Sequence, residues 1–324
     1  MKKILFVIVV AAIIVLGIYA VSNIGQKPEN DSQKITIITT LFPLYDFAKN
    51  IGQDKAEVTL LLPPGAEAHT FEPRPSDIVK INESDIFVYT GEFMEPWAED
   101  IIKGISDKKV KIVDIGSGIE LMNEEEECEH EEATRKEDDK HEHHRREGVD
   151  PHIWLDFDNA KIMIDSIAKA IAKKDPANAD YYQKNAADYK NKLTKLDDEY
   201  KIALAKCQSK EIVYGGHYAF GYMAKRYGLE YMAAYGASPN SEPSALDLVK
   251  LVEQIKEDDI QYVFYEELVS PKVAETLAKE TGAKLLLLNP AGNLTKKDYK
   301  NRATFLSIME NNLKNLSQGL QCNN

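Results

Sequence analysis

The sequence has few cysteines and a deficit of positive charge. Three cysteines occur in 324 residues, Cys128, Cys207 and Cys322, and their spacing matches no zinc finger. Lysine and arginine number 40 against 53 aspartates and glutamates, which gives a formal net charge of −13. This balance argues against nucleic acid or an anionic membrane surface as a partner, and it favours small cations.

Long apolar runs are also absent, apart from one at the N-terminus. Lys2 and Lys3 precede an uncharged run from Ile4 to Val21, whose length lies between a signal-peptide core and a membrane-spanning helix. We expect residues 1–24 to be a signal peptide or, because no A-x-A cleavage site and no lipid-accepting cysteine follows, an uncleaved membrane anchor. The positive charges before the run place the remainder outside the cytoplasm. A buried core helix fits less well, since a polar linker follows at 25–33.

That location bears on the cysteines. Extracytoplasmic compartments allow disulfides to form and persist. Cys207 and Cys322 could pair there, which would leave Cys128 among a group of histidines.

From residue 34 the sequence alternates β-rich runs with helical patterns. This rhythm predicts an α/β fold of two lobes, at 34–175 and 207–324, each with a roughly four-stranded parallel sheet flanked by helices. A single closing helix is expected from Thr295 to about Leu320. The eight β-rich runs are KITIITT, EVTLLL, DIFVYTG, KVKIVDIG, EIVYGG, LEYMAAYG, IQYVFYEE and KLLLLN.

One long helix is predicted between the lobes. Asp175 and Pro176 form an N-cap and first-turn pair, and apolar residues then recur at steps of three and four as far as Tyr200. A helix over 176–206 would be about 45 Å long at 1.5 Å per residue, enough to span both lobes. An ordinary surface helix is the alternative, but the length favours a rigid strut.

The tract from Asn123 to Glu147 differs from the rest of the chain, with twelve acidic residues, five basic residues and four histidines. Its composition is typical of a disordered loop. A solvated linker is the ordinary interpretation of such a charged run, but imidazoles interleaved with carboxylates favour weak metal capture. We therefore expect a secondary, low-affinity metal loop formed by His130, His141, His143 and His144.

The other three histidines each follow a predicted strand. His69 lies in PPGAEAHTFEP, His152 in VDPHIWLD and His217 in VYGGHYAFGY. Ligands bind outside the carboxyl ends of strands in open α/β sheets, so these imidazoles should meet in a cleft between the lobes. A lone histidine is more often structural, whereas three at equivalent strand ends, with no other histidine in either lobe outside the acidic tract, indicate a metal site.

The donor set favours zinc. Imidazole suits zinc among the abundant cations, whereas manganese prefers more oxygen ligands. Zinc requires a fourth donor, for which Glu266, Glu267, Glu67 and a water molecule are candidates. Glu266 and Glu267 could instead accept hydrogen bonds that orient an imidazole. We expect aromatic side chains to exclude water from the site: Phe71, Trp154, Tyr218 and Phe220.

Four segments resemble a known family: PPGAEAHTFEPRPSD, DPHIWLD, GGHYAFGY and FYEELVSPKVAETLAKETGAK. In order and spacing they are similar to the metal-specific solute-binding proteins of zinc and manganese ABC importers, from about Lys34 to the C-terminus. The resemblance implies two α/β lobes joined by a rigid helix, with the ion in the cleft between them. It implies that His69, His152 and His217 are the ligands. It also implies a monomer whose partners are an ABC permease and its ATPase.

Some features of the chain agree with the zinc branch of that family, and others depart from the family pattern. Manganese-type members usually carry a glutamate where His217 stands, and the inserted His- and acid-rich tract also resembles the zinc branch. Gly292, in LNPAGNL, stands where zinc-binding relatives can have a glutamate, so a three-histidine site completed by water or another carboxylate is expected. Phe157 replaces the usual proline after DPHIWLD, which should affect only the start of a helix.

The leading hypothesis is an extracytoplasmic zinc receptor rather than an enzyme. A zinc enzyme is the main alternative, because three histidines and a water also make a metal-hydroxide nucleophile. No general acid or base is convincingly placed beside them. Further alternatives are a manganese-binding member of the family and an anchored metal buffer. Another is an adhesion protein, because that label is sometimes attached to the family.

Overall fold

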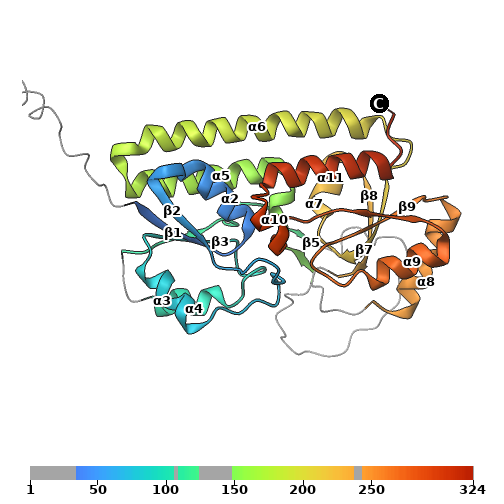
Figure 1. Ribbon diagram of the computed structural model, residues 1–324, viewed down its shortest axis with the longest axis horizontal. Coiled ribbons are helices and arrows are strands. Elements are labelled where there is room, and N and C mark those ends of the chain that lie inside the picture. The colour runs from blue at the N-terminus through green and yellow to red at the C-terminus, as the bar shows by residue number, and fades with distance from the viewer. Residues whose placement is uncertain (1–33, 106–108, 124–147, 237–242, 324) are drawn as a thin grey trace, which may run out of the picture. The chain divides into compact units, whose positions relative to one another are not determined.

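A computed structural model describes residues 34–105, 109–123, 148–236 and 243–323 (Figure 1). The predicted N-terminal signal or anchor, Cys128 and the predicted low-affinity histidines His130, His141, His143 and His144 lie outside these residues. Within the part of the chain that is described, every helix is too short or too polar to span a bilayer.

The first lobe is built on a four-stranded parallel sheet with the strand order β2-β1-β3-β4. All four side chains of the strand segment Ile86–Tyr89 are buried, as expected for a parallel sheet covered on both faces. The strands are β1 (Ile35–Thr39), β2 (Ala56–Leu60), β3 (Ile86–Tyr89) and β4 (Lys111–Asp114). The helices of this lobe are α2 (Phe42–Gly52), α3 (Pro75–Glu83) and α4 (Ala98–Gly104).

The second lobe repeats this design with the strand order β10-β9-β7-β8. Both sheets agree with the predicted fold class. The strands are β7 (Glu211–His217), β8 (Glu230–Tyr235), β9 (Tyr262–Tyr265) and β10 (Lys284–Leu287). The helices are α7 (Gly221–Tyr227), α8 (Ala245–Glu257), α9 (Lys272–Thr281), α10 (Lys296–Lys300) and α11 (Phe305–Gly319).

The long helix is present as α6 (Ala179–Ala205), preceded by a 3-10 turn, η4 (Pro176–Asn178). Its predicted apolar stripe is buried from Tyr182 to Tyr200. The hydroxyl of Tyr189 donates to Asp46 of α2 at 2.6 Å, and that of Tyr200 donates to the carbonyl of Met309 in α11 at 2.6 Å. The helix therefore contacts both lobes, as Figure 1 also shows for α2 and α11.

A second central helix, α5 (Phe157–Lys174), packs along α6. Asp156 caps it by accepting hydrogen bonds from the backbone N–H groups of Asp158 and Asn159. A capping carboxylate can begin a helix without proline, so the change at Phe157 leaves the start intact. A short antiparallel pair, β5 (Met122–Asn123) and β6 (Val149–Asp150), precedes it and was not predicted.

The prediction of one closing helix is wrong. The structure divides this segment into α10 and α11. Thr295 caps the first helix and Thr304 caps the second, each accepting from a backbone N–H three residues later. Arg302, with φ 56°, lies between them in the left-handed region. Two strong N-caps nine residues apart thus start two helices rather than continuing one.

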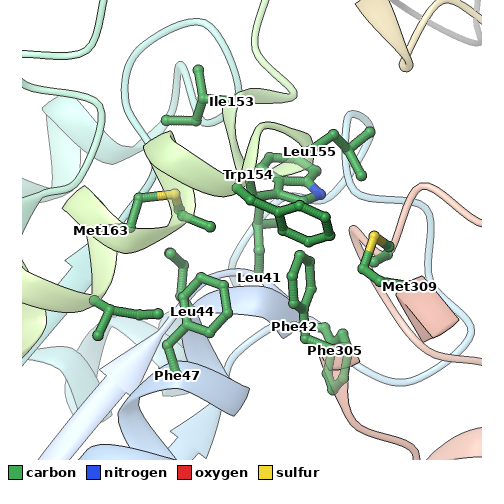
Figure 2. Packing of buried hydrophobic residues seen from close by; sticks show 14 of the residues in the cluster. Leu41, Phe42, Leu44, Phe47, Ile153, Trp154, Leu155, Met163, Phe305 and Met309 are labelled. Carbon is green, nitrogen blue, oxygen red and sulfur yellow. The ribbon is translucent and has the colours of Figure 1, made fainter. Parts of the chain in front are cut away.

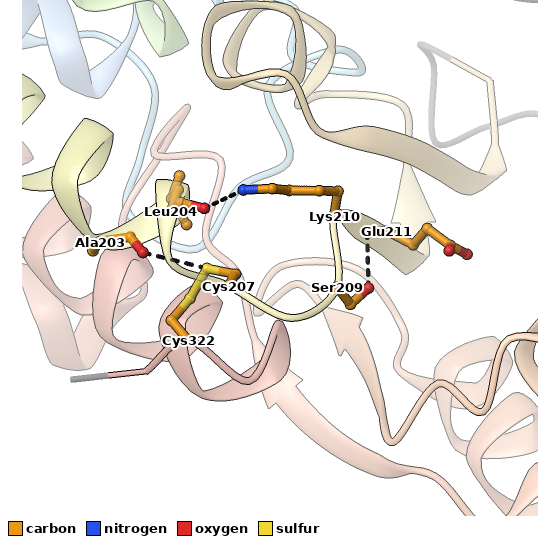
Figure 3. The surroundings of a disulfide bond; sticks show 7 residues. All are labelled: Ala203, Leu204, Cys207, Ser209, Lys210, Glu211 and Cys322. Atoms are coloured by element: carbon orange, nitrogen blue, oxygen red, sulfur yellow. Dashed lines mark hydrogen bonds between the residues drawn. A yellow bond between two sulfur atoms is a disulfide. The ribbon is translucent and has the colours of Figure 1, made fainter.

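Cys207 and Cys322 form a disulfide, as the sequence suggested (Figure 3). Cys207 follows the end of α6 and Cys322 follows α11, and the two cysteines also form an isolated antiparallel bridge. The bond therefore ties the long helix to the C-terminal end of the second lobe.

The principal core joins both lobes around the segment that follows His152. Figure 2 shows Trp154 beside Phe42 of the first lobe and Met309 of the second. Trp154 is fully buried, and its indole N–H donates to the carbonyl of Pro290 at 2.7 Å. This packing anchors the segment that carries His152.

Candidate metal centre

His69, His152 and His217 meet at one point. Their ligating nitrogens lie within 4.8 Å of one another, and among the described residues they are the one such group of three metal donors. The Nε2 atom of His152 lies 3.2 Å from that of His69 and 3.0 Å from that of His217. His69 and His152 are 83 positions apart in the sequence, and His152 and His217 are 65 positions apart. Their imidazole nitrogens nevertheless lie together.

His217 is the last residue of β7, and the glycines before it allow close packing. A Cβ atom on Gly216 would lie 2.6 Å from Oε1 of Glu266, and one on Gly215 would lie 2.5 Å from the Cβ of Ala274. Glycine at both positions lets the strand end approach β9 and α9. The two glycines before His217 are thus required by close packing at the end of the strand.

Two carboxylates orient two of the imidazoles. Nδ1 of His152 lies 2.7 Å from Oδ1 of Asp150, and Nδ1 of His217 lies 2.9 Å from Oε1 of Glu266. Each carboxylate also accepts from the backbone N–H of its own histidine. With Nδ1 engaged, Nε2 of each ring is free to face the cluster, which is the usual arrangement around a bound metal.

His69 is positioned through its backbone. Glu67 accepts from the N–H of His69 at 3.1 Å and from that of Thr70 at 2.9 Å. These bonds shape the loop between β2 and α3. His69 is half-buried, whereas His152 and His217 are 2% and 4% exposed, so His69 is the ligand candidate nearest to solvent.

The candidate carboxylate ligands take different places. Glu266 is the hydrogen-bond partner of His217, and Glu67 shapes the loop that carries His69. Glu267 accepts from Asn289 at 2.9 Å and does not line the cavity beside the histidines. Burial and the nearby Asp298 raise the pKa of Glu267.

The sequence analysis did not identify Asp150 as part of the site, although it stands two residues before His152.

A cavity of about 40 Å³ adjoins the three histidines. That volume is large enough to hold at least one water molecule. Its walls include Met94, Trp154, Leu268, Val269 and Pro290, so the site is mostly apolar around the polar donors.

Of the aromatic residues expected to exclude water, Trp154 lines this cavity. Phe71 and Phe220 do not: Phe71 packs against Trp97 and Phe220 against Tyr214. Tyr218 packs against Tyr231 and is likewise outside the lining.

Gly292 also lines the cavity. A Cβ atom at this position would lie 3.6 Å from Trp154, which is an ordinary van der Waals contact.

The electrostatics suit a metal cation. Burial, and then the proximity of the other two imidazoles, holds the pKa of His69 well below 6.5. Burial and the neighbouring His217 lower the pKa of His152 in the same way. Burial raises the pKa of Asp150 to about 7, against hydrogen bonding from His152. The His69 and His152 rings are therefore neutral at neutral pH, the form that binds a metal.

Comparison with known proteins identifies the family of the chain. Residues 37–319 match the model of the family described as zinc-uptake complex component A, periplasmic. The chain belongs to this family. It is 39% identical over 314 residues to the high-affinity zinc uptake system protein ZnuA of Bacillus subtilis, covering 96% of each chain.

A second relative is the zinc-binding lipoprotein AdcA of Streptococcus pneumoniae, 38% identical over 98% of this chain. The present chain spans only 61% of that protein. The family match covers residues 37–319, and it agrees with the resemblance found in the sequence.

Solved structures agree with the fold. The Zn(II)-bound ZnuA-like domain of S. pneumoniae AdcA has a TM-score of 0.72 at 35% identity, covering 89% of this chain and 99% of that domain. The laminin-binding protein Lmb of Streptococcus agalactiae has a TM-score of 0.75 at 31% identity, covering 89% of this chain and all of that one. Its structure is described as that of a bifunctional protein with adhesin and metal transporting activity.

Proposed function

We propose that this chain is an extracytoplasmic zinc receptor that binds the ion with high affinity and delivers it to an ABC permease for uptake. His69, His152 and His217 are the proposed ligands, and water completes the coordination. The single observation that carries the proposal is the convergence of three imidazole nitrogens from distant segments within 4.8 Å of one another. Zinc forms bonds of about 2.0–2.1 Å to histidine nitrogen, and a tetrahedral site needs donors that close together.

Three further observations support zinc delivery. The donor set contains nitrogen rather than several oxygens, which favours zinc over manganese. The relatives named above are called zinc uptake and zinc-binding proteins. The N-terminal run of the sequence suits export, and we propose that residues 1–24 either direct export or anchor the chain.

Calorimetric titration of the fragment that begins at residue 33 tests the ion. We expect tight binding of one zinc ion and weaker binding of manganese. His152→Ala should weaken the tightest site by at least about tenfold, because it removes one nitrogen donor that the Asp150 carboxylate orients.

Deletion of residues 124–146 is the matched control for that substitution. It removes four histidines outside the described residues, so fewer ions should bind while the tightest one remains. The assignment is reversed if the deletion abolishes the tight site and His152→Ala does not.

The same protein preparations test the competing functions. A zinc enzyme would hydrolyse a generic ester when zinc is bound and lose that activity in His217→Ala. An adhesion protein would bind a host surface after all three site histidines were replaced. For a zinc receptor we expect neither ester hydrolysis nor binding to a host surface that is independent of the three histidines.

A further inference from the structure

Helix α7 connects the segments that carry His152 and His217. It begins four residues after His217 and lies directly against Asp150, two residues before His152. A Cβ atom on Gly221 would lie 2.9 Å from Oδ2 of Asp150 and 2.7 Å from the hydroxyl of Tyr218. Glycine at the start of α7 thus permits an approach that any other residue would prevent.

Two side chains of α7 hold the His152 segment on both sides of the histidine. Tyr222 and Arg226 are four residues apart, so they project from the same face of the helix. The hydroxyl of Tyr222 donates to the carbonyl of Asp150 at 3.2 Å. Nη1 of Arg226 donates to both carboxylate oxygens of Asp156, at 3.0 and 3.2 Å. His152 lies between these two attachment points in the sequence.

Arg226 also fixes α7 to the long helix. Its Nε and Nη2 atoms donate to the two oxygens of Asp197 in α6, at 2.9 and 2.7 Å, which is a bidentate pair. The side chains of Arg226 and Asp197 are 11% and 3% exposed. Burial alone would raise the pKa of Asp197, but hydrogen bonds from Arg226, Lys201 and Tyr227 hold it well below its usual value. The pair is therefore ionised and geometrically fixed.

We propose that Arg226 is a positioning residue for the metal site, which with Tyr222 clamps the His152 segment against α7 and so presets the distance between His152 and His217. The Nε2 atoms of that pair lie 3.0 Å apart in the structure. A preset pair avoids the cost of ordering two ligands when the metal binds, and preorganisation of this kind raises affinity. The inference rests on the proposed function, because it concerns affinity for zinc.

The test begins with zinc titrations of Arg226→Met and Arg226→Lys. Loss of a group that positions a metal ligand typically costs about 10- to 100-fold in affinity, and we expect that loss in Arg226→Met. Arg226→Lys keeps the charge but loses the planar fork, so its loss should be smaller. Arg226→Lys can also keep an ion pair with Asp197 or Asp156. It therefore gives a second measurement if Arg226→Met folds poorly.

Lys201→Met is the matched control. Lys201 pairs with Asp197 at 2.7 Å, as Arg226 does, but from within α6 itself. Its loss removes a cation beside Asp197 and leaves the contacts of α7 with the His152 segment in place. Zinc affinity in Lys201→Met should equal that of the wild type.

Two readouts separate positioning from general stabilisation. The first is a double-mutant cycle: in a His152→Ala background, Arg226→Met should cause little further loss of zinc affinity, because the residue it positions is absent. The second is the visible absorption spectrum of the Co(II)-loaded protein, which should change in Arg226→Met and not in Lys201→Met.

The outcomes are distinct. A wild type that does not bind zinc would overturn the proposed function. A wild type that binds zinc, with both Arg226 variants equal to it in affinity and in Co(II) spectrum, would overturn this inference. Equal losses from Arg226→Met with and without His152 would also overturn it, because they would indicate a role that does not act through His152.

Discussion

At the scale of residues, the site depends on where each histidine is placed and on what holds its second nitrogen. Asp150 and Glu266 engage Nδ1 of His152 and His217, whereas His69 is placed by its backbone N–H, which donates to the carboxylate of Glu67. Two of the proposed ligands are thus oriented by buried carboxylates, and the third lies on a loop. This difference explains why His69 is the most exposed of the three.

The pKa shifts at the site predict how zinc affinity depends on pH. Zinc binding favours neutral imidazoles and an ionised Asp150, so protons compete with zinc wherever the metal-free protein binds them. Affinity should be level from pH 8 to about 7, and then fall by about tenfold per pH unit as Asp150, whose pKa is raised to about 7, takes up a proton. The fall should be steeper well below pH 6.5, where His69 and His152 also take up protons.

Competition titrations against a chelator of known pH dependence measure this profile. A steep loss of affinity that is complete between pH 8 and 7 would contradict it, because the pKa values of His69 and His152 lie well below that range and that of Asp150 is about 7. The sign is fixed by the chemistry: acid weakens binding and alkali restores it.

The three ligand candidates could be predicted from the sequence because histidine is rare in this chain outside one acidic tract. Their carboxylate partners were harder to assign. Glu266 and Glu267 are adjacent and directly follow β9, so the sequence does not tell which of them faces His217, and only the structure shows that it is Glu266. Asp150 gave a local signal in the segment Asp150–His152, but a carboxylate before proline also commonly forms a turn.

At the scale of elements, the strands and the long helix followed from hydrophobic patterning, and the end of the chain did not. Apolar periodicity continues from Thr295 into α11, so it predicts one helix. The break depends on the capping of Thr304 and on the left-handed backbone of Arg302, which apolar periodicity does not reveal. The pair β5 and β6, with two residues each, is too short to give a periodic signal.

The disulfide gives a prediction at this scale. It closes a loop of 115 residues between the end of α6 and the chain after α11. Loss of a loop closure of that size should lower the free energy of unfolding by about 2–5 kcal/mol. Urea unfolding of Cys322→Ser, compared with wild type under non-reducing conditions, measures the difference.

Cys128→Ser is the control for that comparison, since it removes the third thiol and leaves the pair intact. Its unfolding midpoint should match the wild type. A Cys322→Ser protein as stable as both would show that the bond contributes nothing to the folded state.

At the scale of the whole molecule, one core and one helix join two similar α/β lobes over residues 35–323. The principal hydrophobic cluster contains residues of both lobes, including Phe42, Trp154 and Met309. Helix α6 hydrogen-bonds to α2 in one lobe and to α11 in the other. The histidines therefore come together on a frame built from both halves of the sequence.

If His69, His152 and His217 bind one zinc ion together, zinc K-edge X-ray absorption will show it in the fragment from residue 33 loaded with one equivalent of zinc. We expect three imidazole nitrogens around the zinc at about 2.0–2.1 Å, with one of them lost in each single alanine variant. A first shell with one imidazole or none, unchanged by those substitutions, would contradict it.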